Sequence, residues 1–135
     1  MFLGILVNYS YGQYSMLGKA QDDILVQMPK TYPNLVFIHK SVDPNTKENE
    51  LLYIDSLKAD YVFKFNKQDT CIAFEYLDIQ RNLPYIYPML ERHLFIKQRK
   101  DYWENIFDDV CVTLETISPG DIFVLRFKQI TYLPQ

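Results

Sequence analysis

The alternation of large apolar side chains with other residues in the segment 61–76 constrains the fold of this chain more than any other feature. Every second residue of 61–65 is Tyr or Phe, and 72–76 carries Ile, Phe and Tyr in the same alternation after a polar stretch. Period-2 segments joined by a short polar connection are typical of a β-hairpin. Pairing of the large side chains across the strands would contribute about 0.2 to 1 kcal/mol per pair. The expected paired faces are Tyr61, Phe63 and Phe65 on one strand and Ile72, Phe74 and Tyr76 on the other.

The segment 101–117 predicts the longest helix of the chain. Asp101 and Glu104 stand three residues apart at its start, as in a capping box, and residues 118–120 would end it. A shorter helix from about Pro88 is expected before it. The apolar residues of the long helix recur at spacings of three and four, which places them on one helical face: Trp103, Ile106, Phe107, Val110, Cys111, Leu114 and Ile117.

Shorter patterns along the rest of the chain predict the remaining strands and helices. Runs in which apolar and polar residues alternate, or which are apolar on both faces, predict strands. Residues that cap or interrupt a helix delimit the helices. The expected elements are a buried strand 2–7, a helix between Ser15 and Pro29, an interior strand 35–42, a helix from Asp43-Pro44 to about Ser56, and a last strand 122–127 whose Phe123, Leu125 and Phe127 share one face.

The expected order β-α-β-α-β-β-α-α-β predicts the α+β class, with a mixed or largely antiparallel sheet and helices packed on one face. A length of 135 residues suits a single globular domain over residues 1–135. A composition of 48% hydrophobic and 23% charged residues is close to the average of globular domains. No internal repeat is apparent.

Charge and targeting patterns exclude several classes of protein. The net charge of −3, from 17 acidic and 14 basic residues, argues against nucleic-acid binding, which favours a basic surface. No segment approaches the ~18 apolar residues of a membrane span, and the first residues lack the positive region of a signal peptide. We therefore expect a cytoplasmic protein that binds no membrane, with Cys71 and Cys111 as reduced thiols in the core.

Two chemical motifs fall short of a site. The segment 12–20 approaches a phosphate-binding P-loop, but five residues separate its glycines where the motif needs four, and Ala20 replaces the hydroxyl residue that holds Mg²⁺. A zinc site usually has two ligands close in sequence, whereas the candidate ligands are scattered: His39, Cys71, His93 and Cys111. The sequence therefore predicts no catalytic residue, no metal and no cofactor.

Tyrosine is frequent in the segment 8–14, together with Asn, Ser and Gly. These are the residue types of antibody paratopes, where rigid amphipathic rings lie beside small hydrogen-bonding groups. Tyr9, Tyr11 and Tyr14 are therefore candidate anchors for a partner. The segment 84–88, with two Tyr between prolines, offers a second set of aromatic rings. The alternative is that these rings cover the edges of the core.

Acidic residues form a second candidate contact surface. They lie on one side of the expected helix, and no Lys or Arg occurs between Asp101 and Asp121 to balance them. Such a surface would steer a basic partner, although a solvated helix face is the usual explanation of such a run. The acids are Asp101, Glu104, Asp108 and Glu115, with Asp109 beside them.

These surfaces predict a non-enzymatic protein-binding module whose partner is a basic protein. Small acidic single-domain inhibitors have this character, above all immunity proteins and antitoxins that neutralise a basic, nuclease-like toxin. The alternative is a small enzyme or ligand-binding domain with a site between sheet and helix, for which His93, Tyr85 and Arg92 are the first candidates. A deep pocket with converging polar groups would favour this alternative. A homodimer formed through exposed aromatic residues is a third interpretation.

Overall fold

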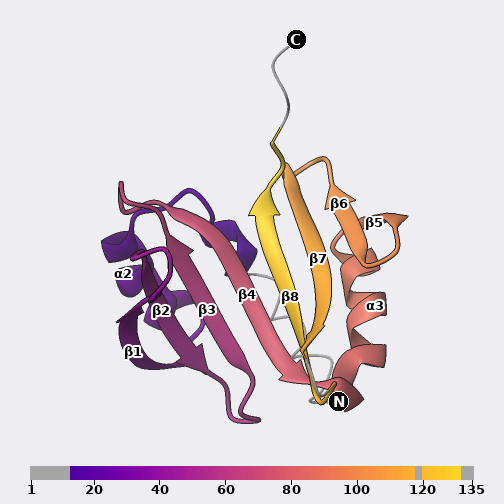
Figure 1. The fold of residues 1–135 in the computed structure, drawn as a ribbon, viewed down its shortest axis with the longest axis horizontal. Helices are drawn as coiled ribbons and strands as arrows, with labels where there is room; N and C mark the ends of the chain where they lie inside the picture. Colours follow the sequence, from indigo (N-terminus) through magenta and orange to yellow (C-terminus); the bar gives the residue numbers. More distant parts are fainter. Residues whose placement is uncertain (1–12, 118–119, 132–135) are drawn as a thin grey trace.

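The structure, a computed structural model, describes residues 13–117 and 120–131. Within these residues one antiparallel sheet of eight strands dominates (Figure 1). The α+β class and the antiparallel sheet are confirmed. None of the helices in this part of the chain is long and apolar enough to cross a membrane. The elements are η1 (Gln13–Met16), α2 (Gln21–Thr31), β1 (Val36–Val42), β2 (Asn49–Ile54), β3 (Asp60–Phe65), β4 (Cys71–Ile79), η2 (Gln80–Asn82), α3 (Leu83–Arg92), β5 (Ile96–Arg99), β6 (Tyr102–Asn105), β7 (Val110–Ile117) and β8 (Ile122–Gln129).

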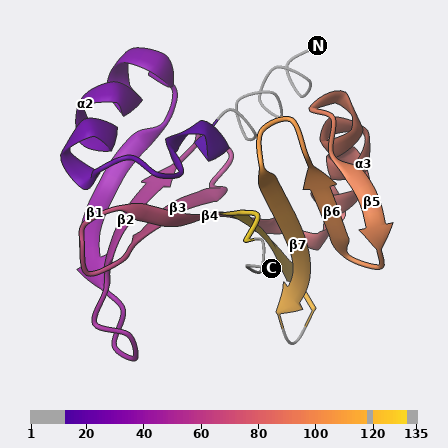
Figure 2. The same ribbon diagram turned by 90° about the horizontal axis from the view of Figure 1, so that it is seen from above.

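The strand order β1-β2-β3-β4-β8-β7-β6-β5 shows that the two halves of the described chain share one topology. In each half an α-helix precedes four consecutive antiparallel strands: α2 precedes β1 to β4, and α3 precedes β5 to β8. The last strands of the halves, β4 and β8, pair at the centre of the sheet (Figure 2). The two halves thus repeat the same order of helix and strands, although no internal repeat is apparent in the sequence.

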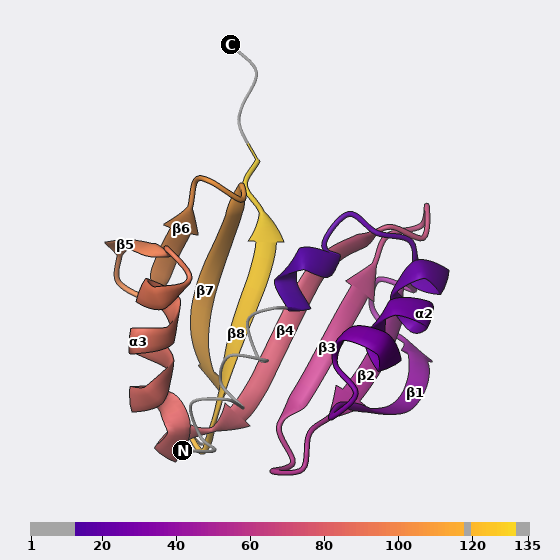
Figure 3. The same cartoon turned by 180° about the vertical axis from the view of Figure 1, so that it is seen from behind.

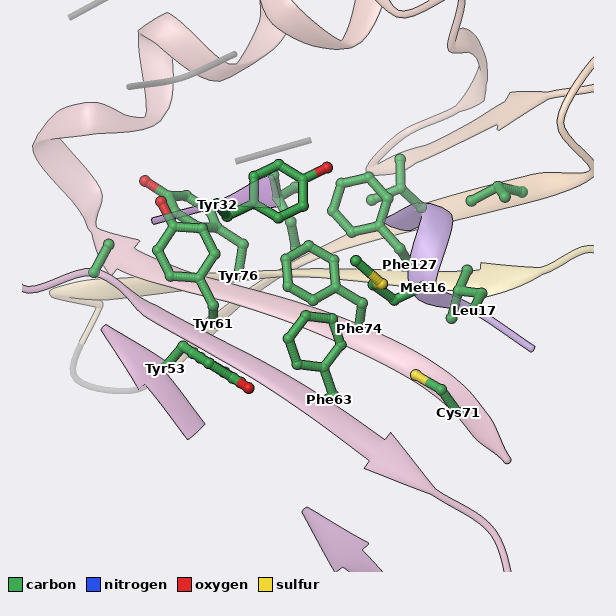
Figure 4. Close-up of a cluster of buried hydrophobic side chains, with 14 of the residues drawn as sticks. Met16, Leu17, Tyr32, Tyr53, Tyr61, Phe63, Cys71, Phe74, Tyr76 and Phe127 are labelled. Atoms are coloured by element: carbon green, nitrogen blue, oxygen red, sulfur yellow. The ribbon is translucent and has the colours of Figure 1, made fainter. Parts of the chain in front are cut away.

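The predicted aromatic hairpin is confirmed as β3 and β4, and its rings form the centre of the core. Tyr61 lies opposite Tyr76 and Phe63 opposite Phe74, with ring centroids 5.2 and 5.1 Å apart. Phe127 on β8 continues this row, 5.5 Å from the ring of Phe74 (Figure 4). The core therefore runs across the junction between the two halves. The predicted last strand is also confirmed, because its apolar face is fully buried: Phe123, Leu125 and Phe127.

The hairpin departs from the prediction at its closed end. A register shift after Lys64 places Phe65 opposite Cys71. Cys71 is therefore buried, and Ile72, which was expected on the aromatic face, is exposed. An extra residue on one strand of an antiparallel pair turns the following side chains to the other face of the sheet.

The helix predicted over residues 101–117 is wrong. These residues form β6, a turn and β7, and β7 pairs with β8 from Val110 to Ile117. Val110, Val112 and Leu114 pack toward the core as alternate residues of a strand, although Val110 and Leu114 also fall at helical spacing. The segment satisfies both periods, so pairing with β8 and the strand preference of its β-branched residues decide the outcome.

The helix predicted from Asp43-Pro44 is also wrong, because a turn and β2 occupy this segment. The Asp43 carboxylate accepts hydrogen bonds from the backbone N–H groups of Asn45 and Thr46 at 2.7 and 3.1 Å, as in an Asx turn. The strand predicted at 35–42 is confirmed as β1. It lies at an edge rather than in the interior, since β2 is its one neighbour among the described strands.

Both α-helices differ in extent from the prediction. Ser15 lies inside η1, and a turn follows it in which Gly18 adopts a φ of +88°, a value that an α-helix does not contain. The helix α2 begins at Gln21 and continues past Pro29, and it lies over β1 to β3 (Figure 3). The helix α3 begins before Pro88, at Leu83. The strand predicted at 2–7 lies outside the described residues.

The two cysteines differ in exposure, so their thiols should differ in reactivity. Cys71 is buried, which raises the pKa of its thiol to about 12, whereas Cys111 on β7 is partly exposed rather than in the core. Thiol reagents attack the thiolate. We expect a disulfide-exchange reagent at pH 8 to modify Cys111 in the native protein and Cys71 only after unfolding. Modification of native Cys111→Ser as fast as that of the wild type would contradict this.

Candidate functional site

The turn between β6 and β7 presents the most exposed large apolar side chains of the described chain. Phe107 is 77% exposed and Ile106 is 65% exposed. Asp108 and Asp109 follow them directly in the sequence. Aromatic residues are enriched at protein interfaces, so the exposed ring of Phe107 is a candidate contact residue. We call residues 105–109 the Phe107 turn.

A buried asparagine holds this turn in place. The side-chain oxygen of Asn105, a residue only 1% exposed, accepts hydrogen bonds from the backbone N–H groups of Phe107 and Asp108 at 2.9 and 3.0 Å. Its amide nitrogen donates to the backbone oxygen of His93 at 2.8 Å and to Asp108 Oδ2 at 3.1 Å. Both functional ends of the amide are therefore used, and the exposed ring of Phe107 projects from a fixed backbone.

The other half of the molecule contains an equivalent turn, between β2 and β3. There Asp55 Oδ1 accepts from the backbone N–H groups of Leu57 and Ala59 at 2.9 and 3.0 Å. Leu57 is 57% exposed at the position that corresponds to Phe107. Lys58 follows it where an acid follows Phe107. In both turns a side-chain oxygen accepts a hydrogen bond from the N–H group of the exposed apolar residue two positions later, whereas the side chain of that residue and the charge after it differ. Leu57 is therefore a suitable control for Phe107.

A cavity of about 410 Å³ opens behind the Phe107 turn. The Tyr14 hydroxyl donates to Asp108 Oδ2 at 2.6 Å across it. The Tyr14 ring packs against Phe95 and Phe127, with centroids 5.5 and 5.9 Å away. Segments far apart in the sequence therefore build this space, which we call the Asp108 cavity. It is lined by Tyr14, Ser15, Leu17, His93, Asp108, Val110 and Gln129.

Burial sets the protonation states of two residues in the Asp108 cavity. It raises the pKa of the Tyr14 hydroxyl, and the hydrogen bond to Asp108 raises this pKa further because it stabilises the protonated phenol. Burial lowers the pKa of His93, and the charge of Arg92 adds to this effect, while Asp108 opposes it. At neutral pH Tyr14 is therefore a hydrogen-bond donor, and the His93 ring is mainly uncharged.

The structure separates the acids that were expected to form one stripe. Asp108 and Asp109 share the Phe107 turn, but Asp101 lies in the turn between β5 and β6. Glu104 on β6 accepts a hydrogen bond from the Tyr102 hydroxyl at 2.6 Å. Glu115 lies 3.4 Å from the guanidinium of Arg126, so it has the basic neighbour that the sequence between 101 and 121 lacks. The continuous acidic stripe is therefore wrong.

The predicted tyrosine anchors and the alternative site residues have different outcomes. Tyr14 meets Asp108 in the cavity, whereas Tyr9 and Tyr11 lie outside the described residues. His93 lines the same cavity, but Tyr85 and Arg92 are not among its lining residues.

The sequence pattern placed Phe107 on the apolar face of a helix, and Asn105 was not considered. A signal was present, because Asn and Asp near an apolar pair are typical of turns.

On the sheet, a second and smaller hollow of about 250 Å³ contains paired charges. Glu75, largely buried, lies 2.5 Å from Arg126 Nε and 3.6 Å from Lys64 Nζ. Lys64 also lies 3.5 Å from Glu50. The Glu75 carboxylate therefore already has two cationic partners, whereas no Lys or Arg is among the lining residues of the Asp108 cavity.

Within the described residues, no group of three or more His, Cys, Asp or Glu side chains could hold a metal ion. Comparisons of the chain with protein-family models, with curated proteins and with solved structures found no match.

Proposed function

We propose that this protein is a non-enzymatic binding module that docks a basic protein through the Phe107 turn. The observation that carries the proposal is the 77% exposed ring of Phe107 on a turn that buried Asn105 holds by four hydrogen bonds. Exposed aromatic rings are frequent centres of binding energy. A ring held in place before binding loses little conformational freedom on docking, which favours affinity.

The charges around this ring indicate the kind of partner. Asp108 and Asp109 adjoin Phe107, and none of the ion pairs among the described residues involves Asp108. Negative charge at the rim of a contact attracts a basic surface and accelerates its association. The net charge of −3 acts in the same direction.

The specific form of the proposal is an inhibitor of the immunity-protein or antitoxin type that acts in the cytoplasm on a basic, nuclease-like toxin. A nuclease binds the phosphates of its substrate through cationic side chains. Asp108 and Asp109 would occupy positions that phosphates otherwise take, while Phe107 would pack beside them. In this form the protein itself binds neither nucleic acid nor membrane.

The Asp108 cavity favours a second candidate function, the binding of a small molecule. Its volume of about 410 Å³ lies near the lower end of the range of ligand pockets, about 300 to 1,000 Å³. Catalysis in it would need a base or a nucleophile. Tyr14 does not supply one, since its raised pKa keeps the hydroxyl protonated. The uncharged ring of His93 in the same cavity is the remaining candidate for a base.

Affinity capture with matched variants tests the proposed function. Tagged wild type, Phe107→Ser and Leu57→Ser would be incubated with lysate of the cells that produce the protein and eluted with a salt gradient. We expect the wild type and Leu57→Ser to retain one basic protein in stoichiometric amount. Phe107→Ser should bind it about 30-fold more weakly, as for a loss of about 2 kcal/mol at an interface centre.

Leu57→Ser is the control for Phe107→Ser. Both residues are exposed at the tips of equivalent turns, so both variants should keep the urea midpoint of the wild type. Equal retention by Phe107→Ser and Leu57→Ser would exclude the Phe107 turn as the docking site. If the captured protein is a nuclease, its inhibition by each variant should follow the same order.

A further inference from the structure

We infer that the Asp108 cavity receives one basic side chain, preferentially arginine, from the protein that docks on the Phe107 turn. The inference depends on the proposed function and names the chemistry of the partner's contact. Asp108 belongs to both the turn and the cavity, and Val110 continues from the turn into the cavity wall. One partner surface can therefore contact Phe107 and reach into the cavity at the same time.

The Asp108 carboxylate has unused capacity for a cation. Its Oδ2 atom accepts hydrogen bonds from the Tyr14 hydroxyl at 2.6 Å and from the Asn105 amide at 3.1 Å. A carboxylate has about four acceptor positions. The two neutral donors fix the orientation of the group without neutralising its charge. A guanidinium or an ammonium group would supply the opposite charge and further N–H donors.

The walls of the cavity suit the stem and the head of an arginine side chain. Leu17 and Val110 provide aliphatic surface for the methylene groups of an arginine side chain. Basic side chains often bury these groups while the charged group remains in a polar environment. The rings of Tyr14 and His93 lie edge to face, with centroids 6.5 Å apart. Planar guanidinium groups stack on such rings better than ammonium groups do. The lowered pKa of His93 keeps a second positive charge out of the cavity at neutral pH.

The other cavity on the sheet provides a contrast. Its most buried acid, Glu75, already has Arg126 and Lys64 within 4 Å. A basic side chain entering there would meet these cations first. The Asp108 cavity combines a carboxylate, apolar walls and aromatic rings without a Lys or Arg among its lining residues. This difference selects the Asp108 cavity as the place for a cationic group.

Titration with capped amino acids tests the inference without the partner. The probes are N-acetylarginine amide, N-acetyllysine amide and N-acetylcitrulline amide, the last being a neutral analogue of the first. Backbone NMR signals of Val110 and Gln129 would report binding. We expect the arginine probe to bind more tightly than the lysine probe and the citrulline probe to produce no saturable shift.

Two matched variants assign the effect to one carboxylate. Asp108→Asn removes the charge but keeps an acceptor oxygen for Tyr14 and Asn105, and we expect at least a tenfold weaker affinity for the arginine probe. Asp109→Asn makes the same charge change at the next residue, which does not line the cavity, and should leave this affinity within about twofold. Retention of the captured protein should fall for Asp108→Asn; Asp109→Asn serves as a control for the probe alone, because Asp109 also belongs to the proposed contact with the partner.

Three results would overturn the inference. The first is the absence of a saturable arginine shift in the wild type, and the second is equal binding of the citrulline and arginine probes. The third is probe binding that depends on Asp108 while the captured protein is retained equally by Asp108→Asn and the wild type, which would make the cavity a site for a small cation. None of these results affects the comparison of Phe107→Ser with Leu57→Ser, so the proposed function stands or fails separately.

Discussion

Replacement of Phe127 by alanine is expected to lower the free energy of unfolding by about 3 to 5 kcal/mol. The side chain is 0% exposed, and its ring lies 5.5 Å from Phe74, 5.8 Å from Phe95 and 5.9 Å from Tyr14. It therefore contacts both halves of the sheet and the segment that precedes α2. Domains of this size have total stabilities of about 5 to 15 kcal/mol. The loss would thus remove a large share of the stability.

Equilibrium unfolding in urea would measure this loss, with Phe37→Ala as the control. Phe37 is 45% exposed on the edge strand β1 and contacts Tyr53 at 5.3 Å. Its truncation leaves no enclosed cavity, so a loss below about 1.5 kcal/mol is expected because most of its apolar surface already meets water. Similar losses for the two variants would show that the core does not centre on Phe127.

Replacement of Asn105 by alanine should cost about 2 to 4 kcal/mol and weaken partner binding as well. Four hydrogen bonds would be lost, and the backbone oxygen of His93 would lose this donor. A net hydrogen bond contributes about 1 kcal/mol, and an unsatisfied buried group costs about 1 to 3 kcal/mol. Without this support Phe107 would sample many orientations, and the entropy lost on docking would increase.

The matched control for this prediction is Asn66→Ala. Asn66 also accepts hydrogen bonds from two backbone N–H groups, those of Gln68 and Thr70, both at 3.0 Å, but its turn between β3 and β4 is open to solvent. Water can replace these bonds, so we expect a loss of about 1 kcal/mol. Urea midpoints and affinity for the captured protein would be measured for both variants. Equal destabilisation, or unchanged binding by Asn105→Ala, would contradict the proposed role of the buried amide.

The parts of the fold that could be predicted are those in which neighbouring residues carry the whole signal. The β3–β4 hairpin and β8 were predicted correctly because alternation has a period of two residues and needs no distant partner to be recognised. The helix prediction for residues 101–117 was wrong because the pattern of neighbouring residues was ambiguous there. Val110 and Leu114 suit a strand and a helix equally, and only the contact with β8 distinguishes the two.

The candidate site was predictable only in fragments. Tyr14, His93 and Asp108 were each singled out from the sequence, but for separate surfaces and separate functions. Their meeting depends on the packing of η1 against β4 and of the Tyr14 ring against Phe127, which brings Tyr14 to Asp108, 94 residues further along the chain. Phe107 was placed on the apolar face of an expected helix, since an exposed and a buried aromatic residue look alike in a sequence.

Local chemistry in the chain was sufficient for the β3–β4 hairpin, for the strands β1 and β8 and for the balance of charge. Short-range alternation acts within a few residues, so its effect is readable without the fold. The tertiary structure decided the strand order, the shared topology of the two halves, the edge position of β1 and the Asp108 cavity. Each of these features depends on pairing or packing between distant segments, above all between β4 and β8. All strands of the chain compete for partners, so the sequence of a single strand does not determine which strand it pairs with.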